Sequence, residues 1–282
     1  MHDALKLQGF DHAVVNVRDG MDDAVRRWQQ FGFSLTPRGF HSAGSINHLM
    51  MLGSDYIELL GFPPGGENAR PELRDQPVGL NGLVLRPDDA QVLHDDLRAR
   101  GVMVNPVDQL SRPIDTAQGP REVRFATVRF PVGAGVAGGR LYFCQHLTPE
   151  LVWQPQWQSH ANGATAVKFI SVVVPDPKAE AAVYARIFGD SQVEDLGWGV
   201  RVRMGHAAVL LCTLKDFQEH FPHGALDLGQ RTACMAALTV KVDSLARVGE
   251  LLALNGVALH PGPKSLYVPA TLANNLVLEF TQ

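Results

Sequence analysis

The sequence predicts an α+β protein in which four βαβββ modules pair into two domains with curved mixed sheets. Three observations support this fold class. A strand followed by a helix and a glycine recurs four times along the chain. In every copy an aspartate stands 13 residues before that glycine, and short β-rich runs follow it. The longest interval between copies falls near the middle of the chain, which divides the modules into two pairs.

The first module begins near residue 10 with a strand rich in β-branched residues, in FDHAVVNVRDGMDDAVRRWQQFGF. Asp19 is an acidic signal for the start of a helix, and Gly32 marks its end. Within this helix, Val25, Trp28 and Phe31 lie along one side. The runs FSLTPRGFH, SINHLMML and DYIELLGF then predict three more strands.

The other modules begin near residues 79, 167 and 234 and repeat this order. Their aspartate and glycine pairs are Asp88 and Gly101, Asp176 and Gly189, and Asp243 and Gly256. The last module continues with the β-rich runs VALH, SLYVPATLA and NNLVLEF. Because one module leaves a face of its sheet uncovered, we expect two modules to pair around a core or a cleft.

A chain of 282 residues with 45% hydrophobic and 19% charged residues is long and apolar enough for two packed domains. The Pro-, Gln- and Ser-containing segment TPELVWQPQWQSHANGAT separates the second and third modules. We therefore predict an N-terminal domain over residues 1–152 and a C-terminal domain over residues 164–282.

The charge pattern argues against nucleic acid as a partner. The net charge is -4, the pI is about 6.2, and no run of Lys or Arg exceeds two residues. The three scattered cysteines fit a reducing compartment, and neither a signal-peptide pattern nor a long apolar stretch is visible. We expect a cytoplasmic protein that binds a small molecule and no membrane, and a homodimer is compatible with the sequence.

The chain resembles the glyoxalase-like domain proteins of the vicinal oxygen chelate superfamily. FDHAVVNV, PRGFHSAGSINHLMMLGSDYIELLGF and LYFCQHLTPELVW carry this resemblance, and the four modules extend it over the whole chain. The superfamily includes glyoxalase I, extradiol dioxygenases, fosfomycin-resistance proteins and bleomycin-binding proteins. The resemblance implies metal ligands from the first and last strands of two paired modules.

In the first pair of modules, the resemblance places His12 and Asn81 on the first strands and Glu58 and Gln145 on the last. It therefore implies that His12, Glu58 and Gln145 hold a divalent metal such as Zn, Ni, Mn or Fe. Asn81 is a fourth ligand or, like Gln145, a contact to substrate.

Strand alternation supports the position of His12, because His12, Val14 and Asn16 share one face and Ala13, Val15 and Val17 share the other. Glu58 stands in an apolar strand, where a carboxylate needs a partner, water or metal. The structural alternatives are a hydrogen-bonded histidine at a strand edge and a glutamate on a solvated sheet face.

The segment HSAGSINHLMML adds His41, Asn47 and His48. A histidine followed by Gly-Ser-x-Asn resembles glyoxalase-like relatives. Beside a Gly-Ser turn, His41 could bind an anionic or carbonyl oxygen or act as general base, and His41 and Glu58 are the candidate catalytic residues. Asn47 and His48 are assigned to substrate binding. The alternative for His41 is a solvated loop histidine, and His146, which alternates to the face opposite Gln145, is a second choice for the site.

The second pair of modules presents Phe169, Leu211 or Cys212, Ala236 and Glu279 at the matching positions. Three of the four cannot hold a hard cation, so we expect this half to have lost the metal. Extradiol dioxygenases carry iron in their second pair through two histidines and a glutamate, which makes ring cleavage the less favoured reaction.

The sequence thus favours a metal-dependent glyoxalase-like enzyme, such as a lyase or isomerase, that chelates vicinal oxygens of a small substrate in the N-terminal half. The alternative is a metal-free protein of the same fold that binds and sequesters a small molecule. A GxSxG elbow and a Walker loop are both absent from the sequence.

Overall fold

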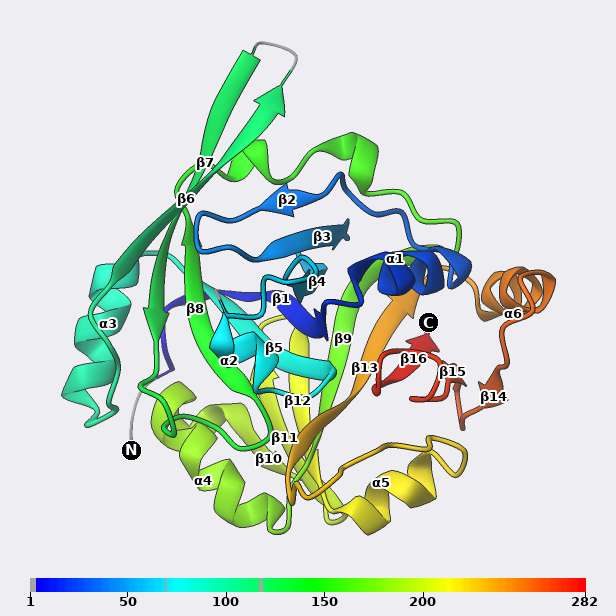
Figure 1. The fold of residues 1–282 in the computed structure, drawn as a ribbon. Helices are drawn as coiled ribbons and strands as arrows, with labels where there is room; N and C mark the ends of the chain where they lie inside the picture. Colours follow the sequence, from blue (N-terminus) through cyan, green and yellow to red (C-terminus); the bar gives the residue numbers. More distant parts are fainter. Residues whose placement is uncertain (1–3, 69, 117–118) are drawn as a thin grey trace.

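The computed structural model describes residues 4–68, 70–116 and 119–282, and these form two eight-stranded mixed sheets (Figure 1). The first half contains β1 (Leu7–Arg18), α1 (Met21–Gln30), β2 (Gly39–Phe40), β3 (Ile46–Met51), β4 (Tyr56–Gly61), α2 (Pro71–Arg74), β5 (Gly79–Pro87), α3 (Ala90–Ala99), β6 (Asp108–Thr116), β7 (Gly119–Arg129) and β8 (Arg140–His146). Two 3-10 helices follow, η1 (Pro149–Leu151) and η2 (Pro155–Trp157).

The second half repeats this order. It contains β9 (Ala164–Val173), α4 (Pro177–Phe188), η3 (Asp190–Gln192), β10 (Val193–Asp195), β11 (Gly199–Met204), β12 (Ala207–Cys212), α5 (Leu214–His220), β13 (Cys234–Val242), α6 (Leu245–Leu254), β14 (His260–Pro261), β15 (Ser265–Val268) and β16 (Val277–Thr281). The four predicted βαβββ modules and their pairing into two curved sheets are confirmed.

The modules of a pair join through their first strands. In the first half the strand order is β2-β3-β4-β1-β5-β8-β7-β6, with β1 parallel to β4 and antiparallel to β5. In the second half the order is β10-β11-β12-β9-β13-β16-β15-β14. The first and last strands of both modules therefore lie side by side in the centre of each sheet.

The first sheet curls until its edge strands β2 and β6 contact each other, which makes it almost a closed barrel (Figure 1). At this closure a side chain on Gly39 would lie 2.8 Å from Nη1 of Arg112. One face of the sheet thus points into the barrel and is called the inward face below. The other, outer face packs against helices.

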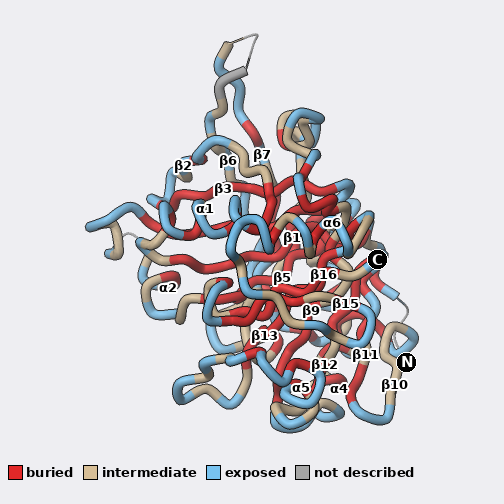
Figure 2. The backbone as a smooth tube through the Cα atoms, turned by 90° about the vertical axis from the view of Figure 1, so that its right-hand side faces the viewer, coloured by how far each residue is buried: buried red, intermediate tan, exposed pale blue. Residues whose placement is uncertain are grey.

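The outer face forms the main core. As predicted, Ala13, Val15 and Val17 of β1 lie on this face, where they belong to one buried cluster with Ala24 and Trp28 of α1. The same cluster continues into the second half, so buried positions run through the middle of both sheets (Figure 2). Hydrophobic burial therefore stabilises the two halves together.

The halves are joined by close polar and backbone contacts. Trp28 Nε1 donates to Asn274 Oδ1 at 3.0 Å, and the carboxylate of Asp55 pairs with His206. Gly32 adopts a φ of 86°, and a side chain there would lie 2.5 Å from Leu251 of α6. Only glycine accepts both this conformation and this approach.

Residues 147–163 connect the last strand of the first sheet to the first strand of the second, and they pack on the first half. His160 Nε2 donates to the carbonyl of Met51 at 2.8 Å, and Asn162 Nδ2 donates to the carbonyl of Phe31 at 2.9 Å. The domain limits at residues 152 and 164 stay a prediction. In the described part of the chain, no helix combines the length and apolarity needed to cross a membrane.

The predicted helix signals require a correction of one residue in three modules. Asp176 caps α4, but the residues at the caps of the other module helices are Gly20, Asp89 and Ser244 rather than Asp19, Asp88 and Asp243. These three helices begin two residues after the aspartate, whereas α4 begins one residue after it.

We predict that Asp89→Ala lowers the free energy of unfolding by about 1 kcal/mol, because a capping side chain satisfies free amides of the first turn. Oδ1 of Asp89 accepts from the amides of Gln91 and Val92, both at 2.9 Å. The matched control is Asp88→Ala, since Asp88 is also exposed and lies outside the cap. Urea denaturation of both variants measures the difference, and equal losses would contradict the capping role.

Candidate functional site

Two β-bulges shape the inward face. The pairing of β1 with β5 shifts between Phe10 and His12, and it shifts again where Asn81 stands opposite Val14 and Val15. A bulge inserts one extra residue and re-aims its side chain. Asp11 consequently faces the same interior as His12, and its Oδ2 accepts hydrogen bonds from His12 Nδ1 at 2.7 Å and from His146 Nε2 at 3.0 Å.

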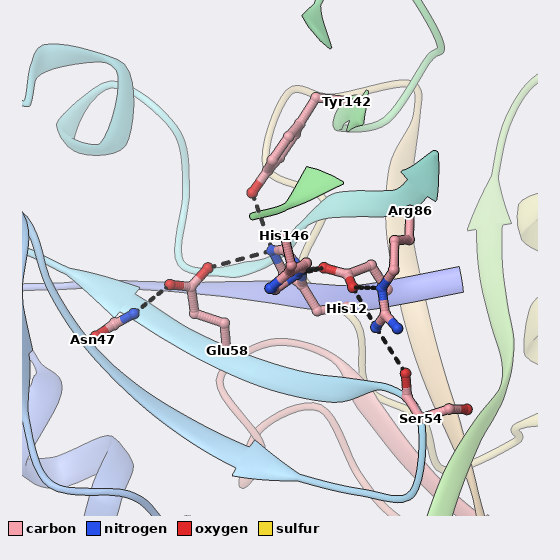
Figure 3. A network of polar contacts seen from close by, with 8 residues as sticks. His12, Asn47, Ser54, Glu58, Arg86, Tyr142 and His146 are labelled. Atoms are coloured by element: carbon pink, nitrogen blue, oxygen red, sulfur yellow. Dashed lines mark hydrogen bonds and ion pairs between the residues drawn. The ribbon is translucent and has the colours of Figure 1, made fainter. Parts of the chain in front are cut away.

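His12 is held in one orientation at the centre of this face (Figure 3). Its ring stacks on Tyr56 with centroids 4.4 Å apart, and Asp11 fixes its Nδ1. Its Nε2 consequently lies 3.3 Å from the hydroxyl of Tyr142 and 3.7 Å from Oε2 of Glu58. Burial raises the pKa of Tyr142, and the charge of Glu58 raises it further, so this hydroxyl stays neutral.

Asp11 is a fully buried carboxylate with three cationic or hydrogen-bonding partners. Arg86 Nε donates to Oδ1 at 2.7 Å, beside the bonds from His12 and His146. Burial alone raises the pKa of Asp11, but the charge of His146 and the two histidine hydrogen bonds hold it well below its usual range. Asp11 is therefore ionised, and Arg86, stacked over Trp153 at 4.2 Å, balances its charge.

Glu58 is linked to His41 through Asn47. Asn47 Nδ2 donates to Glu58 Oε1 at 2.7 Å and lies 3.4 Å from His41 Nε2, while His41 Nδ1 lies 2.7 Å from Ser45 Oγ. Burial lowers the pKa of His41, and although Glu58 raises it, the charge of Arg112 acts with burial. His41 is thus a neutral imidazole whose Nε2 can accept a proton.

Two predicted site residues do not reach this cluster. Gln145 Oε1 accepts from the amide of Ala90 at 3.0 Å, and Nε2 donates to the carbonyl of Asp88 at 3.1 Å, so the side chain lies over the start of α3. His48 Nδ1 donates to the carbonyl of Thr36 at 2.8 Å, away from Glu58. The structure therefore does not bring Gln145 and His48 together with His12 and Glu58, and the predicted site roles of Gln145 and His48 are not carried further.

The prediction for Gln145 was shifted by one residue along β8. Alternation along β8 turns Tyr142, Cys144 and His146 inward and Phe143 and Gln145 outward. Sequence reasoning also missed Asp11, because strict alternation on β1 places it opposite His12 and only the bulge reverses this. The signal that could have found it was an aspartate beside a histidine in an apolar strand.

Asn81 does face inward, at the bulge of β5. Its Oδ1 accepts from Arg140 Nη2 at 3.1 Å, and the side chain is 4% exposed. Arg140 opens β8 and lies on the same inward face as Tyr142. The structure therefore brings His12, Glu58, Asn47, His41 and Asn81 to one face.

Two groups of side chains could hold a metal. Asp11, Cys144 and His146 have ligand atoms within 4.8 Å of one another. However, both oxygens of Asp11 already accept hydrogen bonds, and burial raises the pKa of the Cys144 thiol well above its usual value, which disfavours the thiolate that metals bind.

His12 and Glu58 fit a cation better. Two atoms bonded to one cation at about 2.0–2.2 Å each lie at most about 4.4 Å apart, and His12 Nε2 and Glu58 Oε2 meet this limit at 3.7 Å. The second nitrogen of a metal-binding histidine usually donates to a carboxylate, as His12 Nδ1 does to Asp11.

The second half builds a different interior. Phe217 and Phe221, in and just after α5, form a buried cluster with Cys212, Ala236 and their neighbours, which fills this region with apolar side chains. Glu279 Oε2 accepts from Thr239 Oγ1 at 2.6 Å, and Glu279 and Glu58 are both 7% exposed. Burial raises the pKa of Glu279, but His220, whose Nε2 lies 3.7 Å from Oε1, and the hydrogen bond from Thr239 lower it overall.

Comparisons with known proteins agree with this fold. No curated protein matches the chain. A hypothetical protein from Staphylococcus aureus has a similar structure, with a TM-score of 0.68, 12% identity and coverage of 96% of this chain and 98% of that one.

Two further solved structures are similar. A mutant of 4-hydroxymandelate synthase from Streptomyces coelicolor has a TM-score of 0.60 at 13% identity, covering 99% of this chain and 92% of that one. A xylose isomerase-like TIM barrel/4-hydroxyphenylpyruvate dioxygenase fusion protein has a TM-score of 0.62 at 16% identity, and the match covers 98% of this chain but 49% of that protein. At these identities the likeness shows the fold alone.

The family model of a glyoxalase-like domain matches residues 10–188, from the start of the first predicted module to the end of α4. This match covers more than half of the chain, and it includes the residues gathered on the inward face, which are His12, His41, Asn47, Glu58 and Asn81. The four βαβββ modules, the two curved sheets and this match together show that the chain belongs to the glyoxalase-like domain family, with the vicinal oxygen chelate fold.

Proposed function

We propose that this protein is a divalent-metal-dependent enzyme whose site lies on the inward face of the first half. The observation that carries the proposal is the pairing of His12 Nε2 with Glu58 Oε2 at 3.7 Å, with His12 Nδ1 held by a buried carboxylate. His12 and Glu58 are the proposed ligands. A bound cation would polarise vicinal oxygens of a small substrate and stabilise negative charge on them.

The neighbouring side chains give the site its proposed chemistry. Asn47 holds one oxygen of Glu58 and leaves the other toward His12. His41 is the proposed general base, because its neutral ring lies within hydrogen-bonding range of Asn47 on the same face. Proton transfer beside polarised oxygens suits an isomerase or a lyase, and the apolar cluster around Ala236 in the second half gives no support to ring cleavage there.

The alternative is a metal-free protein that binds and sequesters a small molecule. The contact of His12 Nε2 with the hydroxyl of Tyr142 at 3.3 Å favours it, because that hydroxyl can satisfy the imidazole without a cation. Both readings use the same inward face, and metal content distinguishes them.

We predict that protein purified without a chelator or a metal-affinity tag contains about one divalent metal ion per chain. Mass spectrometric metal analysis measures this content. Glu58→Gln should lose the metal, because it removes a charged oxygen ligand while keeping the size of the side chain. Glu279→Gln is the matched control, since Glu279 is equally buried in the second half. Metal-free wild-type protein, or metal lost only from the control, would refute the proposal.

A further inference from the structure

We propose that the inward face binds the carboxylate of an anionic substrate through Arg140 and Asn81. This inference deepens the proposed function and rests on it, because it names the substrate class of the same site. The substrate would be a small organic acid whose remaining oxygens extend toward Glu58 and His12.

Two buried donors point to this ligand. Arg140 Nη2 donates to Asn81 Oδ1 at 3.1 Å, which holds the two side chains together. Within the described residues, Nε of Arg140 and Nδ2 of Asn81 are buried and have no hydrogen-bond partner. Buried polar groups are almost always paired, so adjacent unpaired donors indicate a site for an acceptor.

The charges around these donors are mostly positive. Arg129 lies over the ring of Tyr142 at 5.6 Å, and Arg70 Nη1 donates to Ser45 Oγ, beside His41. Burial lowers the pKa of the Arg140 guanidinium, and the charges of Arg70 and Arg129 lower it further, although Tyr142 and Glu58 act in the opposite direction.

Arg70 and Arg129 act on the charge of Arg140 with Glu58 as the opposing carboxylate, while Asp11 is already paired with Arg86. This excess of positive charge favours an anionic ligand over a neutral one. Arginine binds planar carboxylates through parallel N–H bonds, and the amide of Asn81 adds a neutral donor beside it. A carboxylate would thus satisfy both unpaired donors at once and would partly neutralise the arginines.

The test uses chelator-treated, dialysed protein and three probes at matched ionic strength: sodium lactate, the neutral isostere lactamide, and inorganic phosphate. Thermal unfolding is followed as each probe is titrated. Lactate should raise the unfolding temperature in a saturable way, because it binds the folded state, and lactamide should have a much smaller effect. Equal or absent responses to lactate and lactamide would overturn the proposal, and a stronger response to phosphate would overturn the carboxylate assignment.

Three variants locate the site. Arg140→Met should raise the dissociation constant for lactate at least about tenfold, since it removes the charged donor. Asn81→Asp should do the same by pairing with Arg140 and repelling the anion, and it keeps the guanidinium if Arg140→Met does not fold. Arg201→Met is the control, because Arg201 also has an unpaired buried Nε among the described residues but pairs with Glu194 in the second half. Loss of lactate binding in this control, or its retention in both site variants, would overturn the assignment.

Because the titrations are made without metal, the two proposals fail separately. Normal metal content with no preference for lactate would remove only the carboxylate site. Lactate binding that depends on Arg140 in a protein that takes up no metal would refute the metal-dependent function and keep the carboxylate site.

Discussion

Asp11→Ala is expected to lower the free energy of unfolding by about 3–5 kcal/mol, because it leaves buried partners without their carboxylate. Arg86 loses the counter-charge at 2.6 Å, and His12 and His146 each lose a hydrogen-bond acceptor. Urea denaturation at neutral pH measures the loss. Asp75→Ala is the control, since Asp75 also pairs with an arginine but at the exposed surface, and we expect little change there.

The same substitution should change how stability depends on pH. The pKa of Asp11 is held far below its usual range, so the folded state keeps the carboxylate ionised where the unfolded state binds a proton. This contribution is fully present above the unfolded pKa of about 3.9 and is lost as the pH falls below it. The free energy of unfolding of the wild-type protein should therefore approach that of Asp11→Ala as the pH drops below about 4. If Asp11→Ala were as stable as the wild-type protein at neutral pH, the contacts of Asp11 with its partners would contribute nothing to stability.

The fold was predictable because its signals are local. Helices α1, α3, α4 and α6 have 10 to 12 residues each, and the glycine that follows each one recurs at the same distance from an aspartate. Strands of one module pair within the module, so β1 and β4 could be recognised from a single stretch of sequence. The pairing of modules then follows from the need to cover one sheet face.

The candidate site was less predictable, because its geometry depends on register and on closure of the barrel. Alternation correctly placed His12 beside Val14, but bulges turned Asp11 inward, and a one-residue shift on β8 exchanged Gln145 for His146. The contact between Arg140 and Asn81 joins residues 59 positions apart and arises only when β8 lies beside β5. β5 and β8 belong to the second module and pair as β1 and β4 do in the first, but the spacing did not show the bulge that turns Asn81 inward.

His12→Ala should lose metal, whereas His146→Ala should retain it. Both histidines donate to Oδ2 of Asp11, but only Nε2 of His12 faces Glu58. Removal of a metal ligand should weaken binding by more than the about 10–100-fold typical of changes to supporting residues. Competition with a chelator, followed by metal analysis of both variants, measures the affinities.

Thermal unfolding of the same two variants measures the structural support that each histidine gives to Asp11. Each variant leaves Asp11 short of one donor, so both should lose a similar stability of about 1–3 kcal/mol. If His146→Ala lost the metal and His12→Ala kept it, the metal site would be assigned to Asp11, Cys144 and His146 instead. Equal losses of stability in variants of a protein that never contained metal would defeat the enzyme proposal, because His12 would then act only as a partner of Asp11 and the metal-free binding protein would remain.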